Sequence, residues 1–420
     1  MGTSLAFHFV FAALGVGLPL LMIVVEGLWL RTGDRRYYRL ARTWSRAMLA
    51  LFAIGAISGT TLAFELGLLW PVFMGNTGAV IGIPFTLEGF AFFIEAIFIG
   101  IYLHGWDRLS PRVHWLCSFP IAISGALSAA AVVSVNAWMN TPAGFTLAHG
   151  VVVDVDPWKA VFNPAMPTEV LHTTLAAYVF TAFAVAALYA LVLVRRPSDS
   201  EAALALRVAM LVALIAIPLQ LVAGDMSSRF DAHSEPLKLA ATEGQFATER
   251  GAPLRIGGIP DAAAHTTRFA LEIPRLLSFL AFDDVNAPVR GVDAFPTLEQ
   301  PPVLAVHLAF DTMVGSGFTL LGIALWWAFA TRLGGRVPAR TLARAVVLSG
   351  VLALVAMEAG WLVTEEGRQP WIVVGFWRTS EAVTTAPALD LAFYGFSLIY
   401  VLLAVTLGWL LAHLHRRNEA

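Results

Sequence analysis

The sequence predicts an all-α fold, a polytopic membrane helix bundle of about nine transmembrane helices with one long extracytoplasmic loop between helices six and seven. Three observations support this prediction. Hydrophobic residues make up 58% of the 420 positions and charged residues only 13%, whereas soluble domains carry about 25% charge. The mean hydropathy is +0.73. Apolar runs also recur at the length of about 20 residues that a helix needs to cross a bilayer.

Each apolar run is expected to be one helix, because a helix satisfies all its backbone hydrogen bonds inside the lipid. The first run is long enough to span the membrane and stay there, so no cleavable signal peptide is expected. The chain divides into helices one to six, a long loop, and helices seven to nine, over residues 1–225, 226–300 and 301–420. The runs cover residues 4–30, 47–69, 85–105, 117–138, 170–194, 207–225, 302–330, 343–364 and 388–412.

Arginine is concentrated in alternate connections. The segments "RTGDRRYYRLARTWSR", "WDRLSPRVHW", "RRPSDSEAALALR", "TRLGGRVPAR" and the tail "HRRNEA" are rich in it, and the short opposite loops hold only Lys159, Arg368 and Arg378. Lys and Arg gather on the cytoplasmic side of membrane proteins. The N-terminus is therefore expected outside and the C-terminus inside.

Composition excludes several kinds of site. Cys117 is the only cysteine, so internal disulfides and paired-cysteine metal or haem-attachment motifs are excluded. The net charge of −2 gives no reason to expect nucleic acid as a partner.

The loop over residues 226–300 is far longer than the others, and long loops are usually functional or disordered. Its segment "PLKLAATEGQF" has helical spacing. We therefore expect an ordered helix on the membrane surface within this loop.

Polar side chains gather in the outer half of the predicted spans. Each one alone has an ordinary structural explanation, such as a hydrogen bond to a neighbouring helix. Together they offer imidazole, thioether and carboxylate groups, which are ligands that haem iron accepts. An ion-binding transporter site is the competing interpretation. The residues are His8, Glu65, Glu88, Glu95, His172, His307, Met313 and Glu365.

Several segments resemble subunit I of the cytochrome bd-type quinol oxidases across essentially the whole chain. They include "LAFHFVF", "SGTTLAFELG", "EVLHTTLAAYV", "PLKLAATEGQF", "FDTMVGSGF" and "GWLVTEEGRQPW", in this order. The resemblance implies a haem-containing terminal oxidase subunit in the bacterial cytoplasmic membrane. It also implies a second membrane subunit (subunit II), with a small single-span subunit as a further candidate partner. The substrates would be ubiquinol or menaquinol, and oxygen.

The resemblance implies two haem b and one haem d, or a third haem b in its place. His172 and Met313 would be the axial ligands of the low-spin haem b. His8 and Glu365 would serve the two high-spin haems, and which haem takes which residue stays open. Glu88 would lie beside the oxygen-reducing haem and is a candidate iron ligand.

Two further residues near the end of span eight follow from the resemblance. Arg368 would brace the haem propionates, and Trp361 would lie among the haems. Arg368 is three residues after Glu365, which places both on one helical surface.

Glu95 would continue a proton path from Glu88, because seven residues separate them by about 10.5 Å along one helix face. Ser128 and Asn136 are weaker candidates to line that path.

Lys238 and Glu243 match the quinol-oxidising pair of the loop that the family calls the Q-loop, here residues 226–300. Five residues apart, they would lie about 140° apart around a regular helix, so a solvated amphipathic helix is the alternative. The resemblance favours quinol binding. The sequence departs from the family pattern at Asp311, where many relatives have an arginine, in its shorter Q-loop, and in its short lead before His8. The last departure suggests a start codon upstream of Met1.

Rival functions make different demands on the sequence. A di-haem cytochrome b or a haem–copper oxidase needs paired histidines within single spans or three histidines around copper, and the span histidines here are too scattered. A proton-coupled transporter using Glu88, Glu95 and Glu365 remains the alternative function.

Overall fold

The computed structural model describes residues 1–336, 338–384 and 389–419, with side chains up to residue 410. It confirms the all-α prediction. Nine helices in the described ranges are long and apolar enough to cross a membrane. They are α1 (Gly2–Thr32), α2 (Arg35–Leu69), α3 (Pro71–Gly105), α4 with α5 (Pro111–Leu116 and Ser118–Asn140), α7 (Met166–Arg195), α8 (Ser200–Ser234), α11 (Val303–Thr331), α12 (Arg340–Gly367) and α14 (Leu389–Glu419).

Several helices begin before the apolar runs that predicted them. The run starting at residue 47 belongs to α2, which begins at Arg35 after Asp34 caps it by accepting the backbone N–H of Arg36 at 2.9 Å. The run starting at residue 85 belongs to α3, which begins at Pro71. Hydropathy detects only the part of a helix that suits hydrocarbon, whereas polar helical ends extend further.

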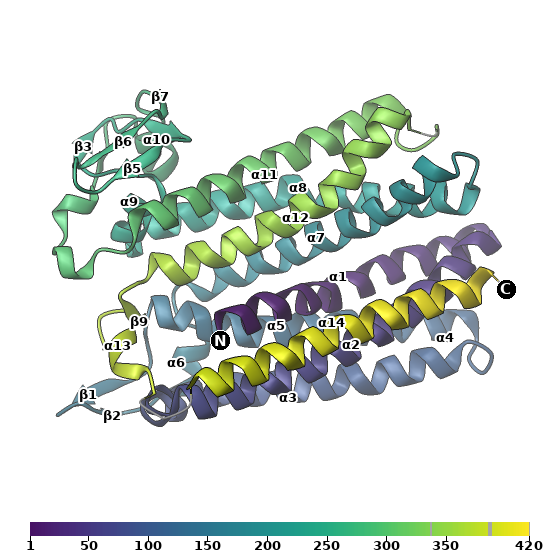
Figure 1. Cartoon of the computed structure of the whole chain (residues 1–420), viewed down its shortest axis with the longest axis horizontal. Helices are drawn as coiled ribbons and strands as arrows, with labels where there is room; N and C mark the ends of the chain where they lie inside the picture. Colours follow the sequence, from purple (N-terminus) through teal and green to yellow (C-terminus); the bar gives the residue numbers. More distant parts are fainter. Residues whose placement is uncertain (337, 385–388, 420) are drawn as a thin grey trace.

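The helices pack in two connected groups. In one, α7 packs along α8 and α12, and α11 packs along α12; in the other, α1 packs along α2 and α3 along α5 (Figure 1). Alanines on α7 and α8 lie in the core between them, and small residues of this kind let membrane helices approach closely. The two groups meet where α1 contacts α7. There a Cβ at Gly17 would lie 2.5 Å from the Cβ of Thr181, so glycine is required.

All four arginine-rich connections between helices lie at the same end of the bundle. These are the α1–α2, α3–α4, α7–α8 and α11–α12 connections, and the Q-loop lies at the other end (Figure 1). The arginines of the C-terminal tail lie outside the described side chains.

The Q-loop is folded rather than structureless. Helix α8 continues into it as far as Ser234, beyond the end expected at residue 225. The helix expected in "PLKLAATEGQF" is confirmed as α9 (Pro236–Thr242). Three antiparallel strand pairs follow, together with α10 (Leu276–Phe282) and two 3-10 turns, η1 (Val292–Ala294) and η2 (Thr297–Glu299). The pairs are β3 with β8 (Glu249–Arg250, Pro288–Val289), β4 with β7 (Leu254–Ile256, Leu271–Ile273) and β5 with β6 (Ile259–Asp261, Thr266–Arg268).

Two smaller strand pairs and two short helices cover the same end of the bundle. β1 pairs with β2 before α6 and α7, and β9 pairs with β10 after α12. Strand β9, which begins at Trp371, is the first strand of this second pair. These elements are β1 (Thr146–Ala148), β2 (Val151–Val153), α6 (Pro157–Val161), β9 (Trp371–Val373), β10 (Trp377–Arg378) and α13 (Thr379–Ala382).

Candidate functional site

His8 lies near the start of α1 and faces α2. Its Nδ1 atom lies 2.9 Å from the hydroxyl oxygen of Ser58. Its Cε1 atom packs over Gly59, where a Cβ would lie 3.0 Å away. A hydrogen bond at one ring nitrogen fixes the ring and orients the other nitrogen toward a ligand. Nε2 of His8 is therefore the atom that could bind iron.

His172 and Met313 belong to the same helix group. The His172 ring on α7 packs against Gly224 of α8, where a Cβ would lie 3.4 Å from Cε1, and the amide nitrogen of Gln220 lies 3.2 Å from Nε2. The sulfur of Met313 on α11 faces Gly360 of α12, where a Cβ would lie 2.9 Å from it. Both predicted ligands thus lie against a glycine, so that no Cβ on the neighbouring helix crowds the His172 ring or the Met313 sulfur.

Helix α12 connects several predicted site residues. The Trp361 ring lies 5.9 Å from that of Phe9, the neighbour of His8 on α1. One turn later, Glu365 accepts a hydrogen bond of 2.7 Å from the amide of Asn136 on α5 and pairs with Arg368. Arg368 is buried, and its Nε atom has no hydrogen-bond acceptor among the described residues. Asn136 therefore lies at Glu365 and not beside Glu95.

Glu88 and Glu95 both lie on α3. Glu95 is buried, and its carboxyl group lies against Gly125 of α5, where a Cβ would be 3.4 Å from Oε1. Glu88 is half-buried. The seven-residue spacing thus places one carboxyl in the α3–α5 contact and the other two turns closer to the Q-loop end.

Lys238 of α9 lies inside a group of carboxylates. Its ammonium nitrogen is 3.1 Å from Glu235 and 3.6 Å from Asp231. Burial alone would lower the pKa of Lys238, but Asp231, Glu235 and Glu169 raise it above its usual value. These carboxylates therefore favour the protonated form of Lys238, which donates hydrogen bonds. Its aliphatic chain lies against Gly367 at the end of α12, where a Cβ would be 3.1 Å from Cγ.

Glu243 follows α9 directly and is also buried. Its pKa is raised to about 8, mainly by burial and further by the charge of Asp311, while Arg255 opposes the shift. His307 holds the backbone beside it, because its Nδ1 lies 2.7 Å from the carbonyl oxygen of Thr242. The other ring nitrogen of His307 lies 3.2 Å from Asp311. Asp311, the departure from the family pattern, therefore belongs to the surroundings of Glu243.

Comparison with known proteins decides the family. The sequence profile described as "Cytochrome bd terminal oxidase subunit I" matches residues 1–419. This chain belongs to the cytochrome bd terminal oxidase subunit I family. The solved bd oxidase of Geobacillus thermodenitrificans is similar over 99% of this chain and 96% of that chain, with a TM-score of 0.94 and 38% identity.

Named relatives in the cytochrome bd family are similar over nearly the full length. A Bacillus subtilis (strain 168) protein provisionally named cytochrome bd menaquinol oxidase subunit I is 36% identical over 99% of this chain and 95% of its own. The Escherichia coli (strain K12) cytochrome bd-II ubiquinol oxidase subunit 1 is 28% identical over 92% of this chain and 89% of its own. The family implies haem cofactors and a subunit II partner.

The side chains of this cytochrome bd subunit suit haem better than a bare metal ion. No group of three or more His, Cys, Asp or Glu side chains in the described ranges could hold a metal ion. Iron in a porphyrin needs only one or two protein ligands, and His8, His172, Met313 and Glu365 occupy separate positions. The buried, unpaired Nε of Arg368 suits an acidic group such as a propionate.

The sequence reading missed three carboxylates within the spans. Glu26 accepts hydrogen bonds from the Tyr102 hydroxyl at 2.5 Å and lies 2.6 Å from Nδ1 of His114, all buried at the arginine-rich end. Glu169 on α7 lies 3.5 Å from the amide of Asn140, and Glu358 lies on α12. An acidic residue inside an apolar run, as for Glu26 and Glu358, or directly before one, as for Glu169, is the signal that would have found them.

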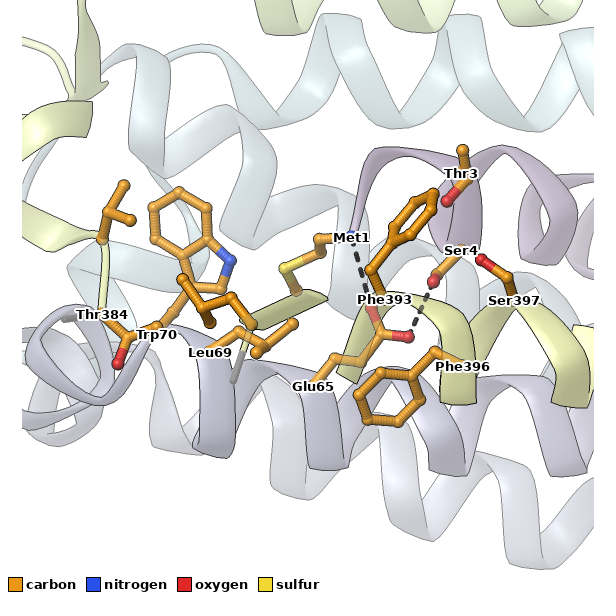
Figure 2. Close-up of a pocket in the computed structure, with 12 residues that line it drawn as sticks. Met1, Thr3, Ser4, Glu65, Leu69, Trp70, Thr384, Phe393, Phe396 and Ser397 are labelled. Carbon is orange, nitrogen blue, oxygen red and sulfur yellow. Dashed lines mark hydrogen bonds and ion pairs between the residues drawn. The ribbon is translucent and has the colours of Figure 1, made fainter. Parts of the chain in front are cut away.

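A cavity of about 220 Å³ opens between α1, α2 and α14 (Figure 2). Glu65 projects into it, is fully buried and accepts a 2.7 Å hydrogen bond from the Ser4 hydroxyl. Ser4 is one turn from His8 on α1. Glu65 therefore anchors the start of α1 rather than joining the residues on α12.

Proposed function

We propose that this chain is the haem-bearing subunit of a quinol:oxygen oxidoreductase. It oxidises quinol at the outer face and reduces oxygen to water with protons from the cytoplasm, which generates proton motive force. The observation that carries the proposal is the placement of α12. Within two turns, this helix contacts Met313 at Gly360, the His8 segment at Trp361, and Lys238 at Gly367.

The proposed cofactors are two haem b and one haem d, or a third haem b in its place. His172 and Met313 would hold the low-spin haem b, and His8 and Glu365 would serve the high-spin pair, with Glu88 as a further candidate ligand. The haems supply electron transfer from quinol and the binding of oxygen. The protein fixes their ligands, as Ser58 does for His8, and Arg368 neutralises their acidic groups.

Lys238 and Glu243 are proposed to bind the quinol headgroup. The Lys238 ammonium donates a hydrogen bond to a quinol oxygen. The pKa of Glu243 is raised to about 8, which is close to neutral pH. The group can therefore take a hydroxyl proton and release it outside. Relatives are named for both menaquinol and ubiquinol, and steady-state rates with each quinol would distinguish them.

Protons for oxygen reduction are proposed to pass through Glu95 and then Glu88. Glu95 is the deeper of the two from the Q-loop end and is enclosed between α3 and α5. A carboxyl group can take a proton on one side and give it up on the other. The path would start at the arginine-rich end, which we assign to the cytoplasm, with the N-terminus outside.

The oxidase is proposed to contain subunit II and, as a further partner, a small single-span subunit. Large apolar side chains on α3, including Phe90 and Phe93, are 65% and 67% exposed, which suits a second membrane subunit or lipid. A fully active, haem-replete preparation of this chain alone would contradict the need for subunit II.

An optical spectrum of membranes that contain the protein tests the function. We expect reduced-minus-oxidised bands of a low-spin haem b together with high-spin haem, and oxygen consumption with added quinol. A colourless protein that moves protons would instead support the transporter alternative. Haem bands without quinol-dependent oxygen consumption would retain the cofactors and reject the reaction.

A further inference from the structure

The carboxylate of Glu235 occupies a fixed position at the junction of α8 and α9. Its backbone N–H donates to the carbonyl of Asp231 at 2.8 Å, and its own carbonyl accepts from Leu239 at 3.1 Å. Its side chain is 8% exposed and contacts Lys238, whose side chain is also 8% exposed. Both helices thus hold this carboxylate beside the residue that is proposed to bind quinol.

One oxygen of this carboxylate lacks a partner. Oε2 of Glu235 accepts the Lys238 hydrogen bond at 3.1 Å. Oε1 is buried and has no hydrogen-bond donor among the described residues. A buried carboxylate oxygen without a donor is costly, and a hydroxyl group is the neutral donor that would satisfy it. Each quinol molecule carries two such hydroxyl groups.

Lys238 cannot take the proton that quinol gives up. An ammonium group has three donors and no acceptor, and the surrounding carboxylates keep Lys238 protonated by raising its pKa. The acceptor on this side of α9 must therefore be a carboxylate. Asp231 also contacts Lys238, but more loosely, at 3.6 Å, and its side chain is 17% exposed.

We propose that Glu235 is a catalytic base of quinol oxidation, a role that rests on the proposed quinol site at Lys238. The O–H bond of the quinol breaks and its proton passes to Oε1 of Glu235, while Lys238 holds the quinol oxygen. The second hydroxyl proton passes to Glu243. The two electrons go to the oxidase and finally to oxygen, so each quinol yields one quinone, two protons and two electrons.

A purely structural role for Glu235 predicts different mutant behaviour. Glutamine keeps the shape and an oxygen that accepts from Lys238, but it cannot take a proton. If Glu235 only positions Lys238, Glu235→Gln should turn over normally or bind quinol less tightly. If Glu235 is the base, Glu235→Gln should bind quinol normally and turn over slowly.

The test measures kcat and KM for quinol in the complete oxidase in membranes. We expect kcat of Glu235→Gln to fall about tenfold or more. A general base accelerates a reaction by about 10²–10⁴-fold, and Asp231 remains nearby to replace part of that contribution. KM should stay within about twofold, because uniform binding is retained. The matched control is Asp284→Asn, an exposed Q-loop carboxylate that accepts from the backbone N–H of Asn286 and should behave as wild type.

An unchanged kcat in Glu235→Gln would overturn the assignment, whether or not KM rises. If that variant fails to assemble its haems, Glu235→Asp and Glu235→Asn provide the comparison, because the two side chains have nearly the same size and shape and only aspartate can take a proton. Equal kcat values in these two variants would reject the base. Lys238→Ala separates the two proposals. If quinol oxidation is impaired in Lys238→Ala but normal in Glu235→Gln, this inference alone is rejected. If Lys238→Ala, Glu235→Gln and Glu243→Ala all oxidise quinol with normal kinetics, the proposed quinol site itself is rejected.

Discussion

The indole ring of Trp361 on α12 lies 5.9 Å from the phenyl ring of Phe9 on α1, measured between ring centres. The residue before Phe9 is His8, and the residue before Trp361 is Gly360, which faces the sulfur of Met313. One aromatic contact therefore joins the helix of one predicted iron ligand to the helix that packs on another. A change at this contact should disturb more than one haem.

Replacement of Met313 by leucine removes a thioether and keeps a similar apolar volume. We expect the low-spin haem to become high-spin and quinol oxidation to slow, because leucine offers no ligand atom. Reduced-minus-oxidised spectra of membranes measure this. Met210→Leu is the matched control, because Met210 lies fully buried in the core and is no predicted ligand. An unchanged spectrum in Met313→Leu would remove this residue from the ligand set.

Gly360→Ala tests the same site without touching the ligand. The added Cβ would lie 2.9 Å from the Met313 sulfur, so the methionine must move and the low-spin band should weaken. Gly322→Ala on α11 is the control, since nothing lies within 4 Å of its added Cβ. Alanine in a helix interior is more favourable than glycine by about 0.5–1 kcal/mol, so this control should unfold at the same or a higher temperature. Equal spectra in both variants would argue against the contact.

The pH dependence of quinol oxidation should report Glu243. Burial raises its pKa to about 8, so the group is neutral below that pH and can accept a proton only above it. We expect kcat/KM for quinol to rise with pH through about 8. In Glu243→Gln this rising limb should disappear, whereas it should persist in Asp284→Asn. A limb that is identical in the Glu243 variant would assign it to another group.

The same shift predicts the pH dependence of stability. The pKa of Glu243 is raised from 4.5 to about 8 in the folded protein, so the folded state binds its proton more tightly. Its contribution to stability is fully present below 4.5 and is lost as the pH rises to about 8. The Tm of the wild type should therefore fall over this window more steeply than that of Glu243→Gln. Parallel Tm curves would show that the carboxyl ionises freely in the folded protein.

Local sequence patterns predicted the spans and the helix of the Q-loop, because hydropathy and helical spacing are properties of contiguous residues. They could not predict which side chains meet across helices. Lys238 contacts Glu235 three residues away, but also Asp231 on α8 and Gly367 on α12. The sequence gives no signal for Glu235, since acidic residues are common in polar loops. Only the burial of its side chain and its unpaired carboxylate oxygen distinguish it.

Spacing on a regular helix was also a poor guide at Lys238 and Glu243. The two residues were expected to point about 140° apart, which favoured a solvated helix. The structure ends α9 at Thr242, and the polypeptide around α9 buries both side chains. A short helix enclosed by a folded loop has no solvent face for either residue, which the sequence pattern of eleven residues could not reveal.

Glu95 is enclosed between α3 and α5, and this makes its proton the most direct test of the oxygen-reducing side. Its carboxyl lies against Gly125. Glu88 lies seven residues before it on the same helix. A purely structural Glu95 would stay protonated and stabilise the helix contact. A relay residue must take and release a proton in each turnover.

Glu95→Gln separates these roles, because glutamine keeps the shape and the hydrogen-bonding capacity but carries no transferable proton. We expect the variant to assemble all its haems and to let quinol reduce the low-spin haem, yet to lose most oxygen consumption, about tenfold or more for a lost acid–base group. Glu88→Gln should be more severe, since it would also disturb the high-spin haem that we propose beside Glu88. Glu201→Gln, at a carboxylate that pairs with Arg39 at the arginine-rich end, should retain wild-type turnover. Full oxygen consumption in Glu95→Gln would assign the residue to helix packing, because a path that needs its proton cannot run through an amide.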